Sequence, residues 1–159
     1  MKLEEAIKQK QFKSEFQKLG LNVMHVAGML DINQQRFFRK YDLTGQQYNI
    51  LRILRGQKGS PIGVYDLVDR MIDRSSNTSR LVEKLKTKGL CDRKVCPTNR
   101  RQAEVTITQA GLDLLKEIDG SIEGFDQQLF GMTEEEAKKL NELLDKLRSG
   151  LITIETNTK

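Results

Sequence analysis

The sequence has few of the residues from which metal and catalytic sites are built. His25 is the only histidine among the 159 residues, so no second imidazole is available to share a metal ion. Neither a nucleophile motif nor a glycine-rich phosphate loop can be found along the chain. We therefore expect a protein that is not an enzyme and that carries no metal or cofactor.

Cysteine is also scarce. Cys91 and Cys96 stand five positions apart and flank a presumed strand. An extended strand rises ~3.3 Å per residue, so the two thiols can form a disulfide only if the turn curls back. We expect Cys91 to be a small core residue, whereas Cys96, near the cations Lys94 and Arg100, is a candidate redox switch.

Long apolar runs are absent as well. No run approaches the ~18 residues that a membrane-spanning helix needs, and the first residues, MKLEEAIKQKQF, lack the apolar centre of a secretion signal. These features predict a cytoplasmic protein without a membrane partner.

Positive charge is distributed unevenly. The formal net charge of the whole chain is only +5. Between Arg74 and Arg101, however, nine lysines and arginines stand against two acids, Glu83 and Asp92. From Gly111 onward six bases stand against eleven acids, so this part should stay away from nucleic acid. The basic stretch predicts a polyanionic partner, and we expect that partner to be double-stranded DNA.

The basic stretch begins with the pattern of an amphipathic helix. Apolar or small residues recur at helical spacing on one face, and polar residues occupy the other. The members of the apolar face are Thr78, Leu81, Val82 and Leu85. Ser75 and Ser76 are placed to cap the start of this helix, and Gly89 can end it in a left-handed conformation.

A β-ribbon is predicted to follow this helix. Residues 90–95 and 103–107 have the composition of two strands, and the turn between them exposes Arg100 and Arg101. A fold has no packing use for paired arginines on a protruding turn. The narrow minor groove of DNA, in contrast, attracts such side chains.

The helix itself suits the major groove. Short polar side chains near its start allow close approach and can bond base edges, while basic side chains further along meet phosphates. The predicted DNA-binding residues, with those of the turn, are Ser75, Ser76, Asn77, Ser79, Arg80, Lys84, Asn99, Arg100 and Arg101. The alternative is that the charged helix face is simply solvated.

Further helices are predicted on both sides of the basic stretch. Thr44 and Gln47 form a capping box at the start of one helix. A helix over residues 64–72 would complete a helix-turn-helix with the basic helix. Thr108 and Thr133 are placed to cap two helices that follow the ribbon.

Apolar seams predict association of two chains. A heptad-like seam near the beginning consists of Phe12, Phe16, Leu19, Val23, Val26, Leu30 and Phe37. A second seam near the end consists of Leu140, Leu144, Leu147, Leu151 and Ile154. A domain of about 70 residues cannot cover both seams, so we expect a homodimer. The alternative is a monomeric bundle. We also expect a break or bend in the first helix near Gly20.

The segment RLVEKLKTKGL, the next strand, the turn PTNRR and the strand ending in ITQAG resemble the recognition helix and wing of the MarR family of bacterial winged-helix transcriptional regulators. The resemblance extends upstream to LTGQQYNILRIL and covers residues 20–150. It implies a homodimer that binds operator DNA and is often released from the DNA by small ligands. Arg101 matches the family's minor-groove arginine, and Asn99 stands where the family usually has aspartate.

The predicted fold is mainly α with a small β wing. A winged helix-turn-helix domain at residues 43–108 would lie between an N-terminal helical arm at 1–42, part of the dimerisation region, and C-terminal dimerisation helices at 109–159. The predicted function is that of a homodimeric repressor of transcription that binds a pseudo-palindromic operator, with a small aromatic or anionic effector as a further partner. Two alternatives stay open: a thiol-based redox sensor on the same scaffold, and a dimeric protein-interaction module that does not bind DNA.

Overall fold

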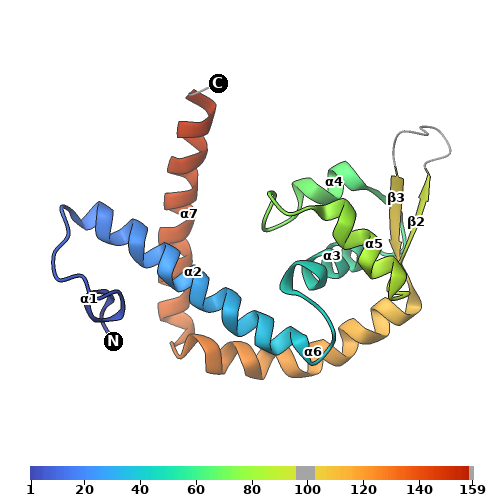
Figure 1. Cartoon of the computed structure of the whole chain (residues 1–159), viewed down its shortest axis with the longest axis horizontal. Helices are drawn as coiled ribbons and strands as arrows, with labels where there is room; N and C mark the ends of the chain where they lie inside the picture. The colour runs from blue at the N-terminus through green and yellow to red at the C-terminus, as the bar shows by residue number, and fades with distance from the viewer. Residues whose placement is uncertain (96–102, 158–159) are drawn as a thin grey trace. The chain divides into compact units, whose positions relative to one another are not determined.

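The computed structural model describes residues 1–95 and 103–157, which are mainly helical with one small antiparallel sheet (Figure 1). The fold class predicted from the sequence is therefore confirmed. The chain divides into two compact units, Met1–Gly120 and Ser121–Lys159. Helix α6, Gln109–Phe130, contains the boundary between them. None of the described helices is both long and apolar enough to span a bilayer.

Helix α2, Glu15–Arg39, is uninterrupted, so the break expected near Gly20 is wrong. One glycine costs about 1 kcal/mol of helix propensity, which the remaining hydrogen bonds of a helix of 25 residues outweigh. A short helix, α1, Leu3–Ala6, precedes it. The Nζ atom of Lys18 on α2 lies 2.6 Å from Oε1 of Glu4 and ties the two helices together.

The core of the first unit is built around helix α3, Gly45–Gly56. The predicted capping box is present: Thr44 Oγ1 accepts from the backbone N–H of Gln47, and Gln47 Oε1 accepts from that of Thr44. At the end of α2 the ring of Phe38 stacks on Tyr48, with centroids 4.4 Å apart. The most deeply buried side chains are Ile50, Leu51, Leu54, Leu67, Val82, Leu85, Cys91, Val105, Leu115 and Ile118.

Helix α4 is shorter than predicted. It spans Val64–Asp69, whereas the sequence pattern extended the helix to Ile72. The chain leaves the helix early because the backbone N–H of Ile72 donates to Asn49 Oδ1 on α3, at 3.0 Å. As a result the Ile72 side chain is 90% exposed instead of buried. The strand β1, Ile62–Gly63, was not predicted, because two residues are too few to show a strand pattern.

The β-ribbon is confirmed. Strands β2, Cys91–Val95, and β3, Ala103–Ile107, pair antiparallel from Cys91 opposite Ile107 to Val95 opposite Ala103. Strand β1 pairs with the other edge of β3, which gives the order β1-β3-β2. The turn residues Cys96, Asn99, Arg100 and Arg101 lie outside the described residues.

Both predicted caps after the ribbon are present. Thr108 Oγ1 accepts from the backbone N–H of Gly111 at the start of α6. Thr133 and Glu136 form a reciprocal capping box before helix α7, Glu134–Asn157, with Thr133 Oγ1 accepting from the backbone N–H of Glu136 at 3.2 Å. Hydrogen bonds from the backbone and hydroxyl of Thr133 lower the pKa of Glu136.

Candidate nucleic-acid interface

Helix α5, Thr78–Thr87, is the central element of the basic stretch. Its cap is Asn77, whose Oδ1 accepts from the backbone N–H of Arg80 at 3.1 Å. The prediction that Ser75 and Ser76 cap this helix is therefore wrong. The helix begins later because these two serines belong to a separate turn.

Asp73 organises the turn before α5. Its Oδ1 atom accepts from the backbone N–H of Ser75 at 2.9 Å and from the Ser75 hydroxyl at 2.6 Å. The hydroxyl of Ser76 donates to the backbone carbonyl of Asp73 at 2.7 Å, and Gln46 on α3 donates to Asp73 Oδ2 at 3.1 Å. Hydrogen bonds from Ser75, with a smaller one from Gln46, lower the pKa of Asp73, so its carboxylate is ionised at neutral pH.

Helix α5 has one buried face and one exposed face. Of the predicted apolar face, Thr78, Val82 and Leu85 are buried and Leu81 is half-buried, which confirms the face. The exposed side chains are Ser79, Arg80, Glu83, Lys84, Lys86 and Thr87. Ser79 and Arg80 therefore stand on the solvent side of the first turn, where a groove of DNA can reach them. Their contacts with DNA remain a prediction.

Two ion pairs join α5 and the residue after it to neighbouring elements. Lys88, directly after the helix, donates to the backbone carbonyl of Asp42 and to its carboxylate, with Nζ 2.8 Å from Oδ2. Arg93 on β2 pairs with Glu83 on the helix. The first pair joins α5 to the loop between α2 and α3, and the second joins it to the ribbon.

Positive charge remains on this surface after the pairing. Arg80, Lys84 and Lys94 are exposed and form no ion pair with any carboxylate in residues 1–95 or 103–157. Arg74 uses its guanidinium to donate to the backbone carbonyl of Asp69, a contact that leaves its charge uncompensated. The described part of the stretch can thus attract phosphates along α5 and β2.

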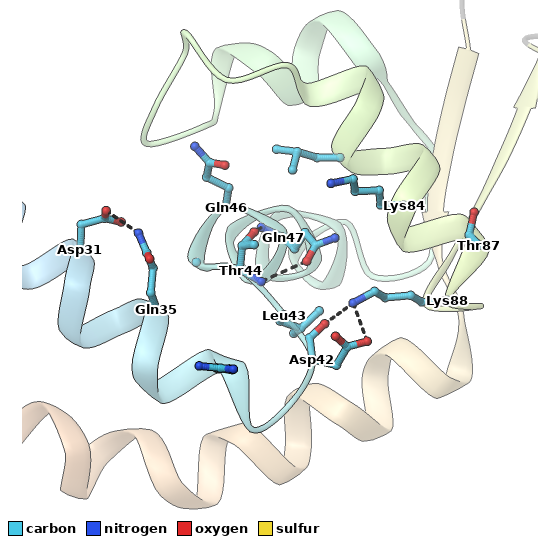
Figure 2. Close-up of a pocket in the computed structure, with 13 residues that line it drawn as sticks. Asp31, Gln35, Asp42, Leu43, Thr44, Gln46, Gln47, Lys84, Thr87 and Lys88 are labelled. Atoms are coloured by element: carbon cyan, nitrogen blue, oxygen red, sulfur yellow. Dashed lines mark hydrogen bonds and ion pairs between the residues drawn. The ribbon is translucent and has the colours of Figure 1, made fainter.

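The structure also shows a hollow that the sequence did not predict. It has a volume of about 820 Å³ and lies between the end of α2, the start of α3 and α5 (Figure 2). Lys84 points into it from α5, and the Lys88–Asp42 pair lies at one edge (Figure 2). Arg39 and Asp31 of α2 complete its charged lining. Because these residues come from distant parts of the chain, no local pattern could predict the hollow.

Cys91 is a core residue, as predicted. It is 1% exposed, and its thiol donates to the backbone carbonyl of Val82. Burial, with smaller effects of Asp92 and Glu83, raises the pKa of the Cys91 thiol to about 11, so it is neutral and a poor nucleophile. A thiol switch on this scaffold would depend on Cys96, outside the described residues. Among residues 1–95 and 103–157, no three His, Cys, Asp or Glu side chains gather as metal ligands would.

Comparison with known proteins agrees with this geometry. A model of the MarR family matches residues 43–103, from two residues before α3 to the first residue of β3. The HTH-type transcriptional repressor IacR of Pseudomonas putida is 28% identical over 130 residues, which cover 81% of this chain and 77% of IacR.

Solved structures share the fold. A MarR transcription factor from Planctomyces limnophilus is 29% identical, with a TM-score of 0.67 over 87% of this chain and 98% of that one. A MarR variant of E. coli in complex with operator DNA has a TM-score of 0.74 at 22% identity, over 87% of this chain and 99% of that one. These relatives are regulators of transcription and not enzymes.

Proposed function

Because the chain belongs to the MarR family of transcriptional regulators, we propose that it is a homodimeric repressor that binds a pseudo-palindromic operator in duplex DNA. Helix α5 enters the major groove, and the turn between β2 and β3 brings Arg100 and Arg101 to the neighbouring minor groove, with Asn99 beside them. The observation that carries the proposal is the exposed first turn of α5, with Ser79 and Arg80 on a helix whose opposite face is buried.

The capping contacts determine what some of these residues can offer to DNA. Asn77 uses its Oδ1 atom to cap α5, so its amide NH₂ group is the part that can donate to a base or a phosphate. Arg80 can donate to guanine or to phosphate from the exposed face. Lys84, as a point charge, contributes sequence-independent attraction to phosphate.

Exposed apolar side chains support the homodimer. On α2, Phe16 is 85% exposed and Met24 is 65% exposed. On α7, Leu143 is 65% exposed and Leu151 is 56% exposed. Pairing of two chains through such side chains would remove this apolar surface from water. A two-fold axis would then present two copies of α5 about 34–36 Å apart, one turn of B-DNA. The repressor role follows the description of IacR.

The effector that we propose, a small aromatic anion, fits the hollow beside α5. Arg39 and Lys84 supply positive charge to the lining, since Lys88 is paired with Asp42, and Leu43 and Leu81 supply apolar surface. An anion bound there would contact α5 and shift its orientation, which would lower the affinity for the operator. Benzoate is a suitable probe: it should weaken operator binding by the wild type, and Arg39→Gln should reduce this effect while leaving operator binding without benzoate unchanged.

Selection of bound duplexes from a random pool tests the proposed function. We expect recovery of an inverted repeat whose half-sites are centred one helical turn apart, about 10 base pairs. Recovery of a single unrepeated site would contradict the symmetric dimer. If no sequence is enriched, operator recognition is refuted, and the protein-interaction module becomes the better account.

A further inference from the structure

Asp73 is an unexpected residue in a surface that binds DNA. Its side chain is exposed and lies in the turn that carries Ser75 and Ser76 toward the first turn of α5. A carboxylate at this place repels phosphates, which costs affinity for any duplex. The contribution of Asp73 to DNA binding must therefore come from its hydrogen bonds within the turn and not from its charge.

The hydrogen bonds of Asp73 determine the direction in which two hydroxyl groups can act. Ser75 Oγ lies 2.6 Å from Asp73 Oδ1, and Ser76 Oγ lies 2.7 Å from the backbone carbonyl oxygen of Asp73. An ionised carboxylate and a carbonyl can only accept, so both serines must donate their single hydroxyl proton to Asp73. Each hydroxyl then has only lone pairs left for a further partner.

We propose that Asp73 is a positioning residue whose carboxylate commits the hydroxyl of Ser75 to accept a hydrogen bond from a base amino group. The Ser76 hydroxyl is committed in the same sense by the backbone carbonyl of residue 73, whatever the side chain there. In the major groove the base amino donors are adenine N6 and cytosine N4. Phosphate oxygens only accept, so they are excluded as partners of the two hydroxyls. The inference rests on the proposed function and adds a preference for A or C over G or T on the strand beneath this turn.

Helix α3 braces the turn so that the acceptors are held in place. Gln46 donates to Asp73 Oδ2 at 3.1 Å, and Asn49 Oδ1 accepts from the backbone N–H of Ile72 at 3.0 Å. Two consecutive residues of the turn are therefore attached to a helix whose buried face forms the core. Groups that are already ordered before binding lose less entropy in the complex, which strengthens discrimination between bases.

The experiment measures the affinity of the full chain for the duplex recovered by selection and for duplexes in which each base pair is replaced in turn. At one position in each half-site the wild type should prefer A or C over G or T on one strand about fivefold, the typical effect of one hydrogen bond. Asp73→Ala should lose discrimination at that position and keep it elsewhere. Asp73→Asn, which retains an acceptor oxygen for Ser75, should keep most of it.

Two further variants separate positioning from charge and from folding. Asp69→Ala removes an exposed carboxylate nearby on α4 and should leave every discrimination ratio unchanged. Gln46→Met removes the brace without changing charge and should lower discrimination at the same position about twofold, by the partial loss of one hydrogen bond. If Asp73→Ala does not fold, Gln46→Met and Asp73→Asn carry the test.

Each outcome is decisive. A wild-type profile in Asp73→Ala and Gln46→Met, or equal losses in Asp73→Ala and Asp69→Ala, would overturn the inference while operator recognition stands. A wild type that prefers no duplex over another would overturn the proposed function, and this inference with it.

Discussion

Any side chain at Gly111 should lower the stability of the fold. A Cβ atom built on Gly111 would lie 2.3 Å from the backbone oxygen of Leu90 and 2.8 Å from Cγ1 of Ile107. The Leu90 oxygen cannot move freely, because it accepts from the backbone N–H of Thr108 at 3.2 Å. Relief of the overlap needs a shift of about 1 Å between α6 and the start of β2, for which overpacking costs of about 3 kcal/mol are typical. Alanine returns about 1 kcal/mol in helix propensity, so Gly111→Ala should lose about 2 kcal/mol.

Urea unfolding at one protein concentration measures this loss. Gly111→Ala should lower the midpoint by about 1 M, given slopes of about 2 kcal/mol per M for a chain of this size. Gly120→Ala is the matched control on the same helix, because a Cβ there meets nothing within 4 Å, and it should stabilise the chain by up to about 1 kcal/mol. Equal stability of the two variants would show that α6 is not packed against Leu90 as described.

Three further predictions concern Lys84, Asp42 and Cys91. Lys84→Gln should weaken binding to every duplex and reduce the salt dependence by about one ion per half-site, whereas Lys139→Gln on acidic α7 should change neither in a salt titration of DNA affinity. Asp42 has φ +52°, so Asp42→Val should destabilise the chain in urea unfolding more than Asp42→Asn, which tolerates this conformation and loses only an exposed ion pair. The raised pKa means that folded Cys91 keeps its proton between pH 9 and 11, where the unfolded chain releases it, so the free energy of unfolding should fall as the pH rises through this range. In a Cys96→Ser background, alkylation of the Cys91 thiol at pH 8 should therefore require urea.

Local patterns predicted the elements of the fold well. The capping boxes at Thr44 and Thr133 and the left-handed Gly89 are present, because each depends on residues at most three positions apart. The apolar face of α5 was predicted for a similar reason, since helical periodicity fixes which side chains share a face.

The errors arose where a particular hydrogen bond, distant in one case and local in another, overrides what residue type and periodicity predict. Ile72 continues a helical periodicity, yet its N–H donates to Asn49, which lies 23 positions away in the sequence. Ser75 and Ser76 are good caps by residue type, but Asp73 holds them in a turn and Asn77 takes their role. The hollow beside α5 depends on the packing of three helices, which spacing along the chain does not encode.

Directed cleavage of DNA tests the central claim, that α5 lies in the major groove of the operator. An iron chelate attached to Ser79→Cys, in a Cys96→Ser background where buried Cys91 does not react, would generate radicals at the first turn of α5. We expect two clusters of cuts in the selected duplex, centred about 10 base pairs apart, and no cuts from the same chelate at Ser149→Cys on α7. Cuts from Ser149→Cys without cuts from Ser79→Cys would contradict the account.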